Sequence, residues 1–171
     1  KISQKVGGLA AGAFDERGEL AGLLYGLSGV RHGRRAHWSH IMAVRDDARG
    51  LGIGRHLKIF QRDFLLGLGI PAAYWSYDPL VSRNAHLNLV RLGAEPVEYA
   101  RDLYGPGDEN ELHRGIGTDR LIVEWRLEDP RGEKALAGEL EPPAGWRQAP
   151  IVNTGAGGEP RDDDFELPDA A

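Results

Sequence analysis

A glycine-rich turn, Arg49-Gly50-Leu51-Gly52-Ile53-Gly54, joins a segment with strand character to a segment with helix character. Residues 37–44 are rich in large side chains and are typical of a strand. Within residues 52–66, apolar side chains recur on one helical face, at Ile53, Leu57, Phe60 and Phe64. The first turn of a helix has backbone N–H groups without intrahelical partners, and the helix dipole adds partial positive charge there. Because glycines let an anion approach such a backbone closely, the turn predicts a phosphate-binding site.

The rest of the chain predicts a mixed α/β fold. Apolar segments 6–14 and 20–29 flank the turn-forming residues 15–18 and predict an antiparallel hairpin. The elements expected after the first helix are a strand over 72–77, a helix from Ser82 to Gly93, and strands over 96–104 and 120–127. This order predicts a central mixed sheet in which antiparallel hairpins frame a strand-helix-strand crossover. The long polar loop from Gly105 to Asp119 has a length that is often functional.

Charge divides the chain into two parts. Residues 1–127 carry seventeen bases and fifteen acids, a balance of +2, whereas residues 128–171 carry four bases and eleven acids, a balance of −7. We therefore expect a folded domain over 1–127 and an acidic tail rich in Pro and Gly over 128–171. A mildly basic domain suits a phosphorylated ligand, but it lacks the dense basic stripe of a nucleic-acid binder.

The sequence also argues against several classes of site. It contains no cysteine, which excludes disulfides, thiolate metal sites and a cysteine nucleophile, and which fits a cytoplasmic location. It contains no run of roughly 18 apolar residues, so we expect no membrane span. The spacing of His37 and His40 places the two rings on opposite faces of a strand, and we expect no metal site.

Two common phosphate-binding motifs do not fit the turn. A Walker loop ends in Gly-Lys-Ser/Thr, whereas Arg55 and His56 follow Gly54. A dinucleotide-binding fingerprint, G-x-G-x-x-G, would place Arg55 or Leu57 at its third glycine. The pattern that fits is R-x-x-G-x-G, starting at Arg49.

This pattern resembles that of the GNAT superfamily of N-acetyltransferases, and the likeness runs from about Val6 to Leu127. The resemblance implies that the backbone amides of the turn hold the pyrophosphate of coenzyme A. Arg49 and Arg55 bracket the turn and are expected to pair with phosphate oxygens. It also implies that the preceding strand, which ends in Met42-Ala43-Val44, separates from its neighbour and receives the pantetheine arm in the gap. The first strand and the helices that usually precede the hairpin have no counterpart, so N-terminal elements are expected to be missing.

Further segments resemble a bacterial and archaeal subgroup of this superfamily whose substrate is unassigned. They are Trp75 to Leu80, Ser82 to Asn88, Leu92 to Ala94, Gly117 to Arg120 and Val123 to Trp125. In the family, the helix after the fourth strand carries an asparagine that contacts the cofactor, and Asn84 is the nearest match. A tyrosine on that helix usually protonates the leaving thiolate, but Leu89 occupies its position. Tyr77 and Tyr104 are other sources of a phenol.

Candidate catalytic residues follow from the chemistry of acyl transfer to an amine. The nucleophile must be neutral, so a base that works near pH 7 is required. His40 is the first choice because it lies four residues before Val44 and, by the two-residue strand period, on the same face. Asp78 is a candidate for binding a cationic acceptor, and Asn88 is a weak donor in place of the missing tyrosine. A structural histidine at position 40 and a turn cap at Asp78 are the alternative interpretations.

The sequence thus predicts an acetyl-CoA-dependent N-acyltransferase that moves an acetyl group directly to the primary amine of a small molecule or peptide. The alternative hypothesis is a GNAT-like module that binds acyl-CoA with little or no catalysis, because the usual tyrosine and the N-terminal elements are absent. A weaker hypothesis is a protein that binds a partner through its acidic tail. Members of the resembled family often form dimers, and the resemblance therefore suggests a homodimer.

Overall fold

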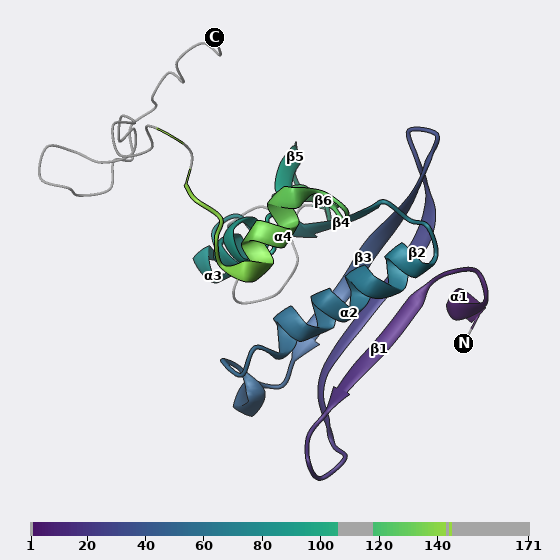
Figure 1. Cartoon of the computed structure of the whole chain (residues 1–171), viewed down its shortest axis with the longest axis vertical. Helices are drawn as coiled ribbons and strands as arrows, with labels where there is room; N and C mark the ends of the chain where they lie inside the picture. The colour runs from purple at the N-terminus through teal and green to yellow at the C-terminus, as the bar shows by residue number, and fades with distance from the viewer. Residues whose placement is uncertain (1, 106–117, 143, 145–171) are drawn as a thin grey trace, which may run out of the picture. The chain divides into compact units, whose positions relative to one another are not determined.

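In the computed structural model, residues 2–105, 118–142 and 144 are described. They form a six-stranded mixed sheet in the order β1-β2-β3-β4-β6-β5 (Figure 1). The strands are β1 Leu9–Phe14, β2 Leu20–Arg31, β3 Arg34–Val44, β4 Ala72–Tyr77, β5 Glu95–Ala100 and β6 Arg120–Arg126. The helical elements are α1 Ile2–Lys5, η1 Asp46–Ala48, α2 Ile53–Gly67, α3 Ser82–Ala85, η2 His86–Arg91 and α4 Pro130–Ala137. The predicted mixed α/β class is confirmed.

The first three strands pair in antiparallel fashion, and β3 then lies parallel to β4. Helix α2 connects β3 to β4, so the predicted strand-helix-strand crossover is also confirmed. The turn between β2 and β3 contains His32 and Gly33, both with positive φ. Two such residues form the kind of turn whose twist matches that of the flanking strands. Strands β4, β6 and β5 complete the sheet through antiparallel pairs.

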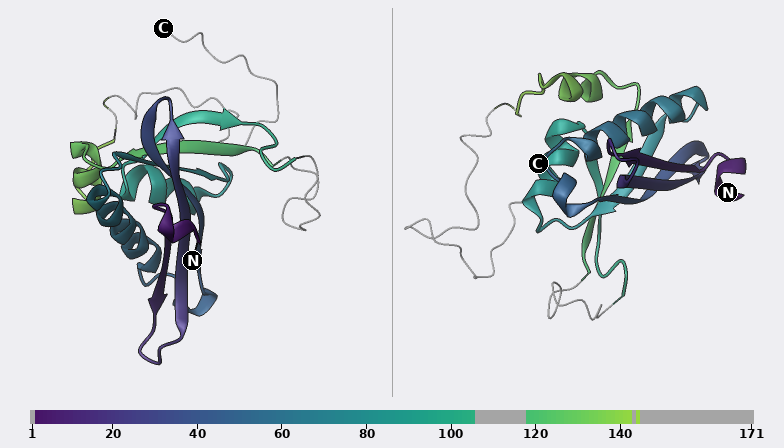
Figure 2. Two further views of the ribbon diagram at one scale, coloured as in Figure 1. Left: turned by 90° about the vertical axis from the view of Figure 1, so that its right-hand side faces the viewer. Right: turned by 90° about the horizontal axis from the view of Figure 1, so that it is seen from below.

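Helix α2 covers one face of the β1–β3 ribbon (Figures 1 and 2). Leu9 of β1, Leu24 of β2 and Leu57 of α2 form a small buried cluster at this contact. The apolar face predicted for the helix was partly wrong, because Phe60 is 54% exposed. Phe60 lines a groove between α2 and β1.

The face of α2 that packs most deeply contains Lys58, Gln61 and Leu65, at spacings of three and four residues. Lys58, which does not belong to the apolar pattern of Ile53, Leu57, Phe60 and Phe64, is only 2% exposed. Two polar residues in a buried helical stripe need polar partners inside the protein. Those partners lie next to the candidate site and are described below.

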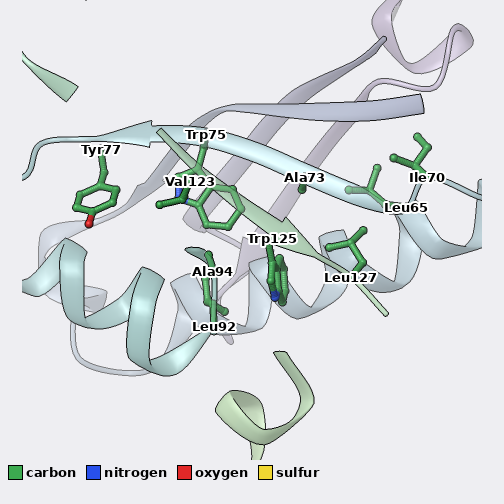
Figure 3. Packing of buried hydrophobic residues seen from close by; sticks show 10 residues of the cluster. All are labelled: Leu65, Ile70, Ala73, Trp75, Tyr77, Leu92, Ala94, Val123, Trp125 and Leu127. Atoms are coloured by element: carbon green, nitrogen blue, oxygen red, sulfur yellow. The ribbon is translucent and has the colours of Figure 1, made fainter. Parts of the chain in front are cut away.

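The main core lies between the β4–β6 pair and the helices that cover it (Figure 3). Trp75 of β4 and Trp125 of β6 meet edge to face, with ring centroids 6.2 Å apart. The buried members of this cluster are Leu65, Ile70, Ala73, Trp75, Tyr77, Leu92, Ala94, Val123, Trp125 and Leu127. This core fixes the position of β4, which forms one wall of the candidate site.

The compact unit extends to Leu140, past the end of the predicted domain at residue 127. Residues 130–137 form α4, which the sequence pattern assigned to the tail. Asp129 caps this helix by accepting a hydrogen bond from the Arg131 N–H, and Gly138 ends it in the left-handed conformation. Most of the predicted tail, and residues 106–117 of the predicted long loop, lie outside the described residues. In the described part of the chain, no helix is long and apolar enough to cross a membrane.

Candidate functional site

The candidate site begins where β3 and β4 separate. These strands pair at only two positions, His37 with Ala73 and Trp38 with Tyr74. Beyond this apex, Ser39 and residues 41–44 pair with β2, and residues 75–77 pair with β6. Two strand edges therefore face each other with unpaired backbone groups, as the family resemblance implied. An extended ligand that contains amide groups can form strand-like hydrogen bonds there.

The glycine turn lies at the open end of this gap, between β3 and α2. Gly50 and Gly52 both have positive φ, at 84° and 77°, and Gly52 is the N-cap residue of α2. No side chain caps the first turn of the helix. The N–H groups at the start of α2 therefore remain available to an anion, and the helix dipole reinforces this site.

The two arginines of the turn have different positions. Arg49 is exposed and forms an ion pair with Asp46 at 2.6 Å, which leaves it at the rim of the turn. Arg55 donates a hydrogen bond to the carbonyl of Leu136, near the end of α4. In this structure the guanidinium of Arg55 is held at the C-terminal end of α4, so phosphate binding by this side chain stays a prediction. Only the backbone N–H of Arg55 stays in the turn.

The last residues of β3 contact the start of α2. A Cβ atom placed on Gly54 would lie 3.5 Å from Cε of Met42 and 3.9 Å from Cγ2 of Val44. Met42 and Val44 thus face the helix, and Ala43 is exposed. The contact holds the unpaired edge of β3 beside the N–H groups of the turn, so one ligand can reach both.

His40 lies on the other face of the sheet, and the prediction that it shares a face with Val44 is wrong. The β2–β3 register shifts between Tyr25 and Gly26, which pair with Ile41 and Ser39, so His40 is the extra residue of a β-bulge. Its ring packs edge to face against Tyr25, with centroids 6.4 Å apart. Tyr25 follows Leu24, which packs on the α2 side, so Tyr25 and His40 lie on the face away from α2.

The polar residues predicted after β4 lie in different surroundings. Asp78 accepts a hydrogen bond from the Leu80 N–H, as expected for its alternative interpretation as a turn cap. Asn84 is half-buried in α3. Asn88 lies in the π-helix η2, is buried, and accepts a hydrogen bond from Nε1 of Trp75 at 3.1 Å. Because Asn88 is held in the core, the prediction that it acts as a catalytic donor is not supported by its position.

A phenol lies on the same face as His40. Ser76 alternates with the core residues Trp75 and Tyr77, so its hydroxyl points away from α2. This hydroxyl lies 3.1 Å from the hydroxyl of Tyr104, which is exposed. The face away from α2 therefore carries an imidazole on β3 and a phenol beside β4.

A buried polar cluster beneath the apex was not predicted. Nζ of Lys58 donates to Oγ of Ser39 at 2.9 Å and to Oε1 of Gln61 at 3.1 Å, and lies 3.6 Å from the ring centroid of Trp75. Burial lowers the pKa of Lys58 to about 7. Burial, together with the charge of Lys58, lowers the pKa of His37 to about 4.

Within the described residues, no group of three His, Asp or Glu side chains is placed to hold a metal ion.

Solved structures of acetyltransferases share this fold. The match to the ribosomal-protein-S18-alanine N-acetyltransferase of Escherichia coli has a TM-score of 0.55 and 18% identity, and covers 71% of this chain and 70% of that one. A GNAT family acetyltransferase from Elizabethkingia anophelis, solved with acetyl-CoA bound, matches with a TM-score of 0.58 and 14% identity, over 73% and 79% of the two chains. An IAA acetyltransferase from Bacillus cereus matches with a TM-score of 0.57 and 18% identity, over 73% and 81%.

The sequence itself matches no family model and no curated protein. The chain has the fold of the GNAT acetyltransferases, with identities of 14% to 18% to these three structures. This confirms the fold that the glycine turn and its neighbouring segments implied.

Proposed function

We propose that this chain is an N-acyltransferase that transfers the acetyl group of acetyl-CoA to a primary amine. The observation that carries the proposal is the separation of β3 from β4 immediately beside the uncapped first turn of α2. Coenzyme A has a pyrophosphate and an extended arm with two amide groups, and these two features match a helix N-terminus and an unpaired strand edge. The similar structure from Elizabethkingia anophelis, which holds acetyl-CoA, supports this ligand.

In this proposal the backbone does most of the binding. The N–H groups of residues 50–55 hold the pyrophosphate, and Arg49 adds a cation at the rim. The backbone of residues 42–44 binds the pantetheine amides, which places the thioester toward the apex. Asn84, after β4, contributes from the opposite wall. The compatibility of the gap with this ligand rests on backbone geometry.

Acyl transfer then uses groups on the face away from α2. The amine lone pair forms the new C–N bond, the electrons of the carbonyl double bond move to oxygen, and collapse of this oxyanion breaks the C–S bond. His40 accepts the proton that the amine nitrogen loses, directly or through a water. The thiolate leaves with the bonding electron pair and takes a proton from Tyr104 or from solvent. Positioning of both reactants supplies much of the rate.

The alternative is a binding module with little catalysis. Leu89 stands where the family's usual tyrosine would be, and its side chain packs against the main core. No phenol from this helix can therefore protonate the thiolate. Tyr104, hydrogen-bonded to Ser76, is the described group that would have to replace it.

Acetyl-CoA is expected to raise the melting temperature of the protein. A ligand that binds only the native state at about 100 times its Kd stabilises it by roughly 2.7 kcal/mol. Differential scanning fluorimetry at up to millimolar acetyl-CoA measures the shift, and release of free thiol with a panel of amines measures catalysis. If acetyl-CoA causes no thermal shift, the proposal is wrong. A thermal shift without thiol release from any amine would favour the binding module.

His40→Ala is expected to lower kcat by about 10²-fold and to change the Kd of CoA by less than twofold. The imidazole takes a proton during transfer but lies on the face opposite the turn that holds the pyrophosphate. The measurement is steady-state thiol release against a CoA titration. His32→Asn, in the turn at the far end of β3, is the control and should retain wild-type kcat. An unchanged kcat in His40→Ala would exclude His40 as the base.

A further inference from the structure

Lys58 is a buried amine with an unusual set of neighbours. Its ammonium group contacts a hydroxyl, an amide oxygen and the face of an indole. Among the described residues, no carboxylate lies within ion-pair distance of it. A buried cation without an anionic partner destabilises the native state, so Lys58 lowers the free energy of unfolding. Its positive charge acts most strongly on its nearest neighbours.

Those neighbours lie at the apex of the gap. Ser39 is the first residue of β3 beyond the last pair with β4, Trp38 with Tyr74. Trp75 is the first residue of β4 beyond the same pair. Lys58 therefore bridges the two walls directly beneath the point where they separate, which is where the proposed function places the acyl end of the thioester.

The hydrogen bonds leave one donor free at this point. A lysine ammonium donates only, so Oγ of Ser39 is the acceptor of the bond from Lys58. The hydroxyl proton of Ser39 is then available, and within the described part of the chain it has no acceptor. Ser39 is 5% exposed, so this proton is held at the inner end of the gap. A hydroxyl that accepts from a cation is itself a stronger donor.

We infer that Ser39, polarised by Lys58, donates a hydrogen bond to the carbonyl oxygen of the bound thioester and stabilises the oxyanion that forms on it. This inference rests on the proposed function. Ser39 is then a catalytic residue that touches the substrate, and Lys58 is a positioning residue that acts through Ser39. The step adds no reactant, because the oxyanion returns its electrons to the carbonyl when the C–S bond breaks.

The surroundings of Lys58 fit this role. His37 is the titratable side chain that interacts with Lys58 from β3, and its low pKa keeps it neutral near pH 7. Ser28 donates its proton to the carbonyl of Gly7, so Nδ1 of His37 carries the proton that bridges to Ser28. His37 therefore adds no second positive charge beside Lys58 near pH 7.

The test compares the binding of acetyl-CoA with that of CoA, because only the first carries the carbonyl oxygen. Calorimetry on the full chain would measure both Kd values for the wild type, Ser39→Ala, Ser39→Thr and Lys58→Met. We expect the wild type to prefer acetyl-CoA by roughly five- to tenfold, Ser39→Thr to keep that ratio, and Ser39→Ala and Lys58→Met to reduce it to about one. The Kd of CoA itself should stay within about twofold, because the backbone holds it.

The outcomes separate this inference from the proposed function. If all four proteins bind CoA but the ratio is the same in Ser39→Ala as in the wild type, the inference is overturned and the function stands. If the wild type binds neither ligand, the proposed function fails and the inference fails with it. A variant that loses the ratio while its circular dichroism spectrum and CoA binding are unchanged excludes a merely structural effect of the substitution.

Discussion

Gly52→Val is expected to weaken the binding of acetyl-CoA by roughly 10² to 10³-fold, the largest loss of affinity for any single substitution proposed for this site. Gly52 has a φ of 77°, a conformation that costs a β-branched residue about 1–2 kcal/mol. Either the backbone rotates and moves the N–H groups, or the isopropyl group occupies the approach of the pyrophosphate. Only Cε1 of His56, at 3.9 Å, lies near the new Cβ, so the side chain would enter open space in front of the turn. Losing two charge-assisted hydrogen bonds of about 1.5–2 kcal/mol each gives the stated change in Kd.

Gly33→Val is the matched control for this variant. Gly33 has a φ of 74° and no neighbour near its new Cβ, so the two substitutions have comparable backbone strain. Gly33 lies in the β2–β3 turn, at the end of β3 opposite to the glycine turn. Calorimetric titration with acetyl-CoA should find an unchanged Kd for Gly33→Val. Equal affinity in both variants and the wild type would mean that the glycine turn is only structural.

The parts of the site that sequence could predict are those fixed by local backbone chemistry. The turn at 49–54, the helix that follows it and the strand that precedes it depend on glycine conformations and on apolar periodicity within a few residues. Each of these features is encoded by the residues that form it. The separation of β3 and β4 came instead from the family resemblance, because no pattern within either strand specifies where two distant strands stop pairing.

The errors arose where tertiary structure changes a local rule. A single extra residue at His40 reverses the two-residue period, and strand sequence alone does not show that the β2–β3 register shifts there. The apolar periodicity of α2 leaves Lys58 off the buried face, yet Ser39 and Trp75 supply partners from other strands and Gln61 supplies one from the next turn of the helix. The Arg55 side chain binds the end of α4, a helix that the sequence pattern did not predict.

The bulge has a chemical consequence for the proposed reaction. It places His40 on the face of the sheet away from α2, while the turn and residues 42 and 44 remain toward the helix. The thioester carbonyl lies in the gap between the two faces, so the amine and the base approach from one side and the oxyanion donor at Ser39 acts from the other. A base on the same face as Val44, as the unbroken strand period predicted, would lie on the side of α2 with the oxyanion donor. The corrected position of His40 therefore fits the proposed reaction better than the predicted one.

The wild-type protein is expected to become more stable, relative to Lys58→Met, as pH rises from about 7 to 10. Burial lowers the pKa of Lys58 from 10.5 to about 7. Between these values the unfolded chain holds a proton that the native protein has released, so the free energy of unfolding rises with pH. Below pH 7 both states are protonated, and the native state carries the full cost of the buried charge. The shift corresponds to roughly 4–5 kcal/mol across the window.

Urea unfolding of the two proteins at pH 6.5, 8 and 10 measures this effect, because ionisations elsewhere in the chain cancel in the difference. The groups around Lys58 allow that cancellation. Burial is the larger cause of the low pKa of His37 and persists in Lys58→Met, β1 has no titratable side chain, and Glu133 of α4 pairs with Arg62 at the surface. The Lys58→Met variant also loses the hydrogen bonds to Ser39 and Gln61, at about 1 kcal/mol each. This loss changes the difference in stability between the two proteins by a constant amount and does not change how that difference depends on pH.

Lys134→Met, at an exposed position of α4, is the control and should give the same difference from the wild type at every pH. Parallel stabilities of wild type and Lys58→Met from pH 6.5 to 10 would show that Lys58 has an ordinary pKa in the folded protein. A rising difference would show that the fold keeps, at working pH, a partly charged amine that it would be more stable without. If the position of Lys58 were purely structural, an apolar side chain there would make the protein more stable. A lysine at the apex of the gap is instead what a role in the oxyanion step requires.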